Sequence, residues 1–200
     1  MAALRSFQAA GSLCAVYLRS YGIRATRVMP QHSPTKSHIF ATPSAILLCS
    51  APRKVRCQKR LAGRKSTEKR LLKDEKKKLV TVSEKGLEAI TKYKLLNQNE
   101  EYSLLKVQLL TGRTHQIRVH MASINHPLIN DEKYGDFVIN KQFSNKHNYK
   151  YQFLHSYIFK FKDMPEKLSY LNNKEFVAPL KKRQKEILKN IFKEEEINEL

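Results

Sequence analysis

The sequence predicts an α+β fold in which strands dominate, and three patterns in its second half lead to this prediction. Leu105, Val107 and Leu109 alternate with polar residues, which is the period of two of a strand with one buried face. The same alternation runs through residues 153–162. After Pro179, apolar residues recur at the spacing of an amphipathic helix. We therefore expect a sheet with helices packed against it.

Two earlier strands are expected at residues 79–82 and 89–96, on either side of a turn at Gly86. A short helix is expected within residues 111–127, the part of the chain that is densest in polar side chains. Thr111 and Gly112 can end the preceding strand, and Thr114 can cap the helix. Apolar residues at helical spacing would then face the core: Ile117, Met121 and Ile124.

Composition divides the chain near residue 67. The 200 residues suffice for one domain and carry 38 Lys+Arg against 18 Asp+Glu, a net charge of +20. Residues 1–67 hold 12 of these cations and no acid, and four prolines interrupt them at short intervals. We expect a poorly ordered basic segment over 1–67, a basic connector over 68–78 and a folded part over 79–200. A presequence, an insertion and a frame-shifted stretch all fit residues 1–67.

The charge predicts a polyanionic partner, with nucleic acid ahead of an anionic membrane surface. No stretch approaches the roughly 18 consecutive apolar residues of a membrane span, so nothing is expected to cross a bilayer. Of the two polyanions we expect nucleic acid, and no membrane partner. His115 and His120 are five residues apart, which is not the i, i+4 spacing of helical zinc ligands, and no metal site is expected. Read from the residues alone, 111–127 is a basic amphipathic helix whose Arg and His side chains contact phosphates.

Three separated segments carry a resemblance to a known family. They are residues 109–120 (LLTGRTHQIRVH), residues 126–136 (HPLINDEKYGD) and residues 153–155 (FLH), and residues 85–93 (KGLEAITKY) suit the strand that precedes them. In this order they resemble the RluA/RluC family of pseudouridine synthases, which modify uridines chiefly in large-subunit ribosomal RNA. The resemblance runs from about residue 78 to the C-terminal helix, and implies an incomplete form of the family's mixed, largely antiparallel sheet.

The resemblance also implies roles for particular residues. Arg118 matches the arginine that pairs with the family's catalytic aspartate. Arg113, His115, Gln116 and Lys133 are expected to contact RNA. A structural turn is expected at Asp131, Tyr134 and Gly135. The family uses no metal and no organic cofactor, so neither is expected here.

The sequence departs from the family at the catalytic aspartate. In the family this residue precedes an apolar strand, and aligning that strand on Ile46, Leu47 and Leu48 puts Phe40 in its place. No acid occurs before Glu68. Because phenylalanine cannot replace a carboxylate in this chemistry, the catalytic nucleophile is unknown, with Asp74 and Asp131 as the first candidates.

Three interpretations stay open. The chain is a pseudouridine synthase of the RluA/RluC type, which we prefer, or an inactive RNA-binding remnant, or the product of a decayed gene. The expected partner is large-subunit ribosomal RNA, bound by a monomer. The expected compartment is the bacterial cytoplasm, or the mitochondrion if residues 1–67 are a transit segment.

Overall fold

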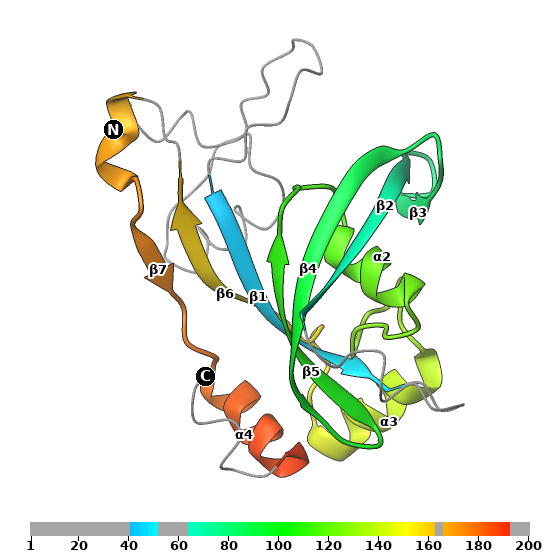
Figure 1. Ribbon diagram of the computed structural model, residues 1–200. Coiled ribbons are helices and arrows are strands. Elements are labelled where there is room, and N and C mark those ends of the chain that lie inside the picture. Colours follow the sequence, from blue (N-terminus) through cyan, green and yellow to red (C-terminus); the bar gives the residue numbers. More distant parts are fainter. Residues whose placement is uncertain (1–40, 52–63, 163–165, 193–200) are drawn as a thin grey trace.

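The computed structural model describes residues 41–51, 64–162 and 166–192 of the chain. The described strands form one sheet of seven, in the order β3-β2-β4-β5-β1-β6-β7, with every neighbouring pair antiparallel. Figure 1 shows this order from β7 at one edge to β3 at the other. The strands are β1 (Ala41–Ser50), β2 (Arg64–Asp74), β3 (Leu79–Val82), β4 (Leu87–Gln98), β5 (Tyr102–Leu109), β6 (Leu154–Phe161) and β7 (Glu175–Val177).

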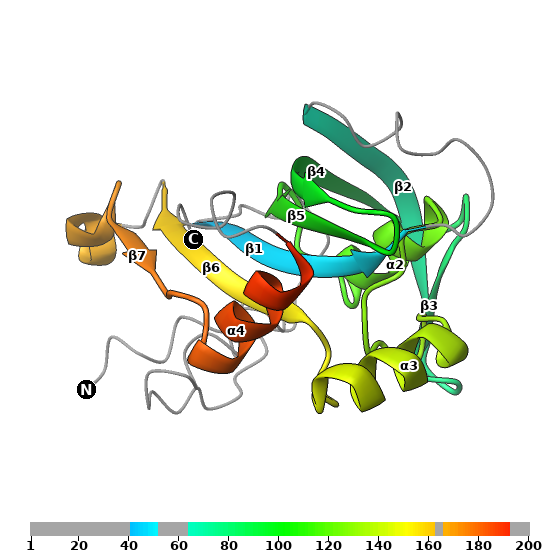
Figure 2. The same cartoon turned by 90° about the horizontal axis from the view of Figure 1, so that it is seen from below.

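Helices cover both faces of the sheet. They are α2 (Gln116–Ser123), α3 (Phe137–His147), α4 (Lys182–Ile191) and a short 3-10 helix, η3 (Glu166–Leu171). Ile117 and Met121 of α2 pack on one face, and Phe143 of α3 and Ile187 of α4 pack on the other. Figures 1 and 2 both show α3 and α4 next to each other. Among the described residues, no helix has the length and hydropathy that a membrane crossing needs.

Strand β1 lies inside the sheet and is buried on both faces. It pairs with β5 on one side and β6 on the other. Ile46 and Leu48 face the cluster under α3 and α4, whereas Leu47 and Cys49 face the cluster under α2. All four side chains are 0% exposed. A strand that is buried on both faces needs apolar residues at every position, which explains its continuous apolar run.

The boundaries that composition suggests do not match the sheet. β1 belongs to the segment 1–67, and β2 crosses residue 67 and ends at Asp74, inside the expected connector 68–78. In β2, Thr67 and Leu71 are buried while Glu68 and Arg70 are exposed, which is the alternation of a regular strand, although Lys69 lies on the same side as Thr67 and Leu71. Residues 1–40, including Phe40, lie outside the described residues, and the origin of this segment stays a prediction.

The other sequence predictions are mostly confirmed. Strands occupy the predicted positions in β3, β4, β5 and β6, and a helix follows Pro179. The polar segment also forms a helix, but α2 begins at Gln116 with His115 as its N-cap and without a side-chain cap, so Thr114 does not cap it. The α+β class with a largely antiparallel sheet is confirmed. Strands β2 and β7, helix α3 and the 3-10 helix η3 were not predicted.

Candidate functional site

The turn between β5 and α2 is built around the side chain of Gln116. Its Oε1 accepts hydrogen bonds from the Thr111 hydroxyl and the Arg113 backbone N–H, both at 2.9 Å. Its Nε2 donates to the Ile90 carbonyl and the Thr91 hydroxyl, both at 3.0 Å. An amide group has two donor hydrogens and two acceptor lone pairs, so all of its capacity is used.

This finding corrects one predicted RNA contact. Gln116 is 2% exposed and keeps no polar atom for an outside ligand. It joins the start of α2 to β4 and to the end of β5. Gln116 is therefore a structural residue, and not the RNA contact that the sequence predicts. Gln116 was predicted to contact RNA because it is a polar residue within a basic motif. That pattern does not show that the Gln116 side chain is buried.

His115 precedes α2 in a left-handed conformation, with φ of 52°. Few residues other than glycine adopt this conformation, although histidine does so more often than most. Its Nδ1 lies 2.9 Å from the Tyr134 hydroxyl, which accepts a hydrogen bond from the Val80 N–H at 2.8 Å. These contacts join α2 to β3 and to the loop of Tyr134, and they fix the imidazole ring.

The environment of His115 favours its neutral form. Burial lowers the pKa of the imidazole first, and the positive charges of Arg118 and Lys133 lower it further. The Tyr134 hydroxyl accepts from Val80 and can therefore donate its own hydrogen to Nδ1 of the neutral ring. That arrangement places the ring proton on Nε2. Because His115 is partly exposed, Nε2–H can serve as a donor to an acceptor oxygen such as a phosphate.

The strongest polar contact of the site joins Arg118 to Asp131. Arg118 donates from Nε to Oδ2 at 2.7 Å and from Nη2 to Oδ1 at 2.5 Å, a bidentate pair. The aspartate side chain is 0% exposed and the arginine side chain 18% exposed. The guanidinium carbon also lies 5.0 Å from the centre of the Tyr134 ring. The arginine that the resemblance pairs with a catalytic aspartate is thus held here by Asp131.

Asp131 is saturated with hydrogen bonds. Besides Arg118, its carboxylate accepts from the backbone N–H groups of Lys133 at 3.0 Å and Tyr134 at 3.1 Å, and from Gln152 Nε2 at 2.9 Å. Burial alone would raise the pKa of this carboxyl. The hydrogen bonds from Arg118 and from the N–H groups of Tyr134 and Lys133 outweigh burial and hold the pKa below its usual range.

The backbone turn at residues 130–135 is tight. Asn130 has φ of 56°, and the Gly135 N–H donates to the Asp131 carbonyl at 3.0 Å. A Cβ on Gly135 would lie 2.3 Å from that carbonyl oxygen, so no other residue fits without moving the backbone. Asp131, Tyr134 and Gly135 therefore lie in one compact turn that fixes Arg118.

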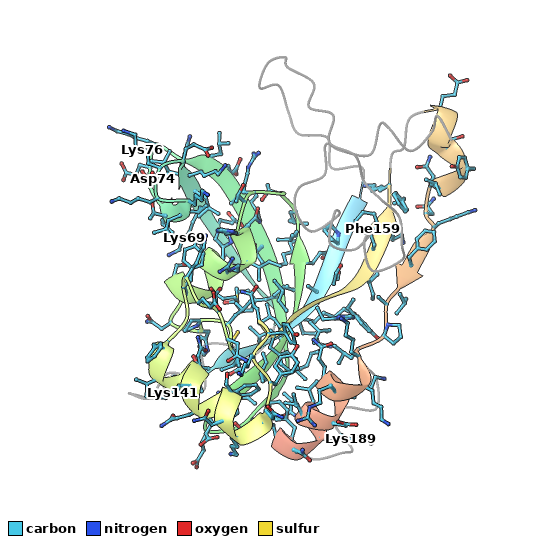
Figure 3. All side chains as sticks on the ribbon, turned by 180° about the vertical axis from the view of Figure 1, so that it is seen from behind. Lys69, Asp74, Lys76, Lys141, Phe159 and Lys189 are labelled. Carbon is cyan, nitrogen blue, oxygen red and sulfur yellow. The ribbon has the colours of Figure 1, made fainter. Side chains whose placement is uncertain are left out.

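Two further predicted RNA contacts lie around the start of α2. The Nε of Arg113 donates to the Glu88 carbonyl at 3.0 Å, and Lys133 Nζ donates to the Lys78 carbonyl at 3.1 Å. Lys133 is exposed and Arg113 partly exposed. With His115 and Arg118 they form a basic cluster, which we call the α2 basic cluster. Figure 3 shows Lys69 of β2 near the same helix.

Neither aspartate proposed as a nucleophile is free. Asp131 uses its carboxylate as described, and Asp74 accepts from the N–H groups of Lys76 at 2.9 Å and Lys77 at 3.0 Å in the β2–β3 turn. Figure 3 shows Asp74 at the tip of this hairpin. Phe40, which the sequence resemblance puts at the position of the family's aspartate, lies outside the described residues. Within the described ranges, no group of His, Cys, Asp and Glu side chains could hold a metal ion.

Sequence reasoning missed the residues that support the Arg118–Asp131 pair from a distance. Gln152 precedes β6, far along the chain from Asp131, and an isolated glutamine carries no sequence signal. Tyr134 was expected only in a turn, but its hydroxyl and ring contact Val80, His115 and Arg118. A tyrosine that follows a buried aspartate by three residues is the one local signal that could have indicated this role.

Comparison with known proteins identifies relatives of this chain. The family model described as RNA pseudouridylate synthase matches residues 24–123. The match therefore begins well before residue 78, where the resemblance was expected to start. It extends from the undescribed N-terminal residues through β1 to the end of α2, which includes Arg113, His115 and Arg118.

Two bacterial relatives match the chain over a longer range. The ribosomal large subunit pseudouridine synthase D of Borreliella burgdorferi is 35% identical over 128 residues, 63% of this chain and 35% of that protein. The synthase C of Buchnera aphidicola is 35% identical over 131 residues, 64% of this chain and 40% of that protein. The matched part of the chain thus spans two fifths or less of the length of these relatives.

A solved structure supports the fold. The human RNA pseudouridylate synthase domain containing 4 protein has a TM-score of 0.52 with this chain at 16% sequence identity. The similarity covers 76% of this chain and 62% of the human one. Over the matched part, the fold is therefore shared with a protein of very different sequence.

Proposed function

Because this chain belongs to the RNA pseudouridylate synthase family, we propose that it acts on large-subunit ribosomal RNA as a pseudouridine synthase of the RluA/RluC type. The observation that carries the proposal is the α2 basic cluster, in which Arg118 is oriented by a bidentate ion pair within a region that the family model matches. The names of the two bacterial relatives support the choice of ribosomal RNA.

The reaction breaks one bond and forms another on the same nucleotide. The bond between ribose C1′ and uracil N1 is cleaved, uracil turns, and C1′ bonds to uracil C5. The hydrogen on C5 leaves as a proton and N1 gains one, so no oxidant or reductant is consumed. A uridine inside folded RNA must first leave its stack, at a cost of a few kcal/mol that stacking and phosphate contacts offset.

The described residues supply the RNA-binding part of this process. Arg113 and Lys133 present cations to the phosphates that flank the uridine, and His115 offers an N–H donor. Arg118 has two guanidinium nitrogens bound to Asp131 and remains 18% exposed, so its remaining hydrogens can reach an oxygen of the RNA. The cleavage step additionally needs a carboxylate next to the ribose.

A second candidate function is RNA binding without isomerisation. One observation and one expectation favour it. The carboxylate of Asp131 is saturated, and alignment of the apolar strand on Ile46, Leu47 and Leu48 puts Phe40 where the resemblance expects the catalytic aspartate. In this case the α2 basic cluster would still bind structured RNA, but the glycosidic bond would stay intact. The two candidates differ in one measurable product.

The deciding experiment measures pseudouridine formed by the purified chain on unmodified large-subunit ribosomal RNA, scored by nucleoside analysis. Product above a no-protein control supports the synthase. No product, together with RNA binding that weakens as salt increases, supports the second candidate. The absence of both product and binding contradicts both candidates.

A single substitution sharpens this experiment. If the chain lacks only its nucleophile, Phe40→Asp should give pseudouridine where the wild type gives none, and Phe40→Asn should not. The asparagine variant has the size and polarity of the aspartate but cannot act as a nucleophile. Equal product from the two variants would show that a carboxylate at this position does not carry the reaction.

The compartment and the oligomeric state belong to the same proposal. We expect a monomer, which light scattering of the purified chain would test against a dimer. We expect the cytoplasm of a bacterial cell, or the mitochondrion if residues 1–67 direct import. A fluorescent fusion of the full chain, compared with one that lacks only residues 1–40 and so keeps β1, would distinguish these compartments.

A further inference from the structure

The loop between α3 and β6 is fixed to the turn that holds Arg118. Asn130 Nδ2 donates to the carbonyls of Tyr149 at 2.6 Å and Tyr151 at 3.2 Å. The next residue, Gln152, donates to the same Asp131 carboxylate that receives Arg118. These contacts hold the backbone on both sides of Tyr151 although the loop has no regular structure. Figure 2 shows this loop joining α3 to β6.

Tyr151 projects from this fixed loop into solvent. Its side chain is 78% exposed, which is unusual for a large aromatic residue on an ordered backbone. Its ring centre lies 5.9 Å from that of Tyr149, and the Tyr149 ring packs against Phe153 at 5.6 Å. Phe153 is fully buried. The exposed ring is therefore supported at one side by aromatic residues that belong to the core.

The surroundings of Tyr151 are basic. The sequence has no Asp or Glu between Asp136 and Asp163, and this stretch contains Lys141, Lys146 and Lys150. Lys146 forms a loose pair with Glu101 at 3.6 Å. Lys150, directly before Tyr151, is exposed and forms no ion pair with any residue the structure describes. Figure 3 shows Lys141 on α3.

We propose that Tyr151 is a stacking platform for an unpaired RNA base, with Lys150 binding the adjacent phosphate. An exposed aromatic ring beside a cation is the combination that proteins use for single-stranded nucleic acid, because every base offers a face for stacking. Bases inside a duplex are already stacked and cannot use it. The proposal rests on the proposed function, and it assigns the partner as an unpaired nucleotide near the uridine that Arg118 approaches.

A protein partner is a weaker explanation for the same exposed ring. Aromatic residues are common in protein interfaces, but lysine is depleted there. Tyr151 has lysine as its neighbour in a stretch free of acids, which favours a polyanion. Its backbone is also fixed to the Arg118–Asp131 turn through Asn130 and Gln152.

The test compares two RNA probes and four proteins. The probes are a stem-loop with a uridine-rich loop and a blunt duplex of the same stem sequence. The proteins are the wild-type chain, Tyr151→Ala, Tyr151→Phe and the control Tyr170→Ala. Tyr170 is also an exposed tyrosine, 60% exposed on η3, but Lys174 Nζ already lies over its ring, 5.8 Å from the ring centre. Affinity is measured by fluorescence anisotropy of labelled RNA at fixed salt.

Tyr151→Ala should weaken binding of the stem-loop about 5- to 150-fold, which is the range for losing one stacked base. Its affinity for the duplex should stay unchanged, and Tyr151→Phe and Tyr170→Ala should bind like the wild type. A loop with 5-iodouridine should crosslink to Tyr151 on irradiation, as located by mass spectrometry.

The possible failures can be told apart. If the wild type binds the stem-loop and Tyr151→Ala binds it equally well, the stacking proposal is wrong and the proposed function is unaffected. An equal loss on the stem-loop and the duplex would contradict stacking in favour of a general loss of structure or charge. If the wild type binds neither RNA, both the stacking proposal and the proposed function are wrong, and a protein partner for Tyr151 becomes the better explanation.

Discussion

Arg118 and Asp131 form a pair that folding depends on. A carboxylate that is removed from water needs its cation, and taking away one partner of a buried pair costs about 3–5 kcal/mol. We expect Arg118→Ala to lower the free energy of unfolding by about this amount, because Asp131 is 0% exposed and would lose two of its hydrogen bonds. Urea denaturation of the purified variant measures the change.

A double-mutant cycle separates this pair from its surroundings. Asp131→Ala and Arg118→Ala should each be costly, whereas the double variant should cost at least about 1 kcal/mol less than their sum. Additive losses would contradict a direct interaction. This cost also means that Arg118→Ala is a poor test of RNA contact, for which Arg113→Ala and Lys133→Ala are better suited.

His120 should make stability depend on pH. The ring is 0% exposed, with Nδ1 at 2.9 Å from the Thr91 hydroxyl. Burial and then the charge of Lys69 lower the pKa of His120 from 6.5 to about 4. As pH falls below 6.5, His120 becomes protonated in the unfolded chain but stays neutral in the folded chain. The free energy of unfolding therefore decreases until pH reaches about 4, where the folded chain binds the proton too.

The measurement compares the pH dependence of two proteins. From pH 7 to pH 4, the wild type should lose about 3 kcal/mol more stability than His120→Gln, because glutamine has no group that titrates in this window. Other histidines also titrate, but they are the same in both proteins. A proton NMR titration that places the pKa of His120 near 6.5 in the folded chain would refute the prediction.

At the scale of elements, β1 is the strand that makes residues 41–50 part of the folded core. Leu47 is 0% exposed at the centre of the sheet. We expect Leu47→Ala to cost about 2–5 kcal/mol, the range for a large side chain removed from a core. Leu72 on β2 is 43% exposed, and Leu72→Ala should change stability by less than about 1 kcal/mol. Similar losses in both variants would contradict the central position of β1.

The elements that could be predicted from the sequence are those with one buried face and one solvent-exposed face. β5 and β6 alternate apolar and polar residues, and α4 carries a clear apolar stripe, so their periods were visible. β1 is buried on both faces and has no period, and in β2 lysine and arginine obscured a regular alternation. In α3 only Phe143 and His147 are buried. The three residues of β7 are all exposed, which leaves no pattern to detect.

The candidate site was predictable only where its residues are close in sequence. The motif around α2 indicated Arg118 and His115, and residues 131–135 indicated a turn. That Arg118 pairs with Asp131 depends on how two segments meet in space. Gln116 was assigned to RNA binding because the sequence does not show which side chains in the first turn of a short helix are buried. Gln152 contributes one long-range hydrogen bond, for which the sequence holds no signal.

At the scale of the whole molecule, charge should dominate RNA affinity. The chain carries a net charge of +20, and cations binding to phosphates release counterions, so affinity falls as salt rises. With about 3–5 phosphate contacts on single-stranded RNA, raising salt from about 50 to 200 mM should weaken binding on the order of 10- to 100-fold.

Single variants connect this bulk effect to particular residues. Lys133→Ala or Lys150→Ala should each reduce the slope of log affinity against log salt by about 0.7, because each removes one phosphate contact. Lys182→Ala on the exposed side of α4 serves as the control and should leave the slope unchanged. If all three variants lower the slope equally, binding depends on total charge and not on a defined surface. A slope near zero for the wild type would contradict electrostatic RNA binding altogether.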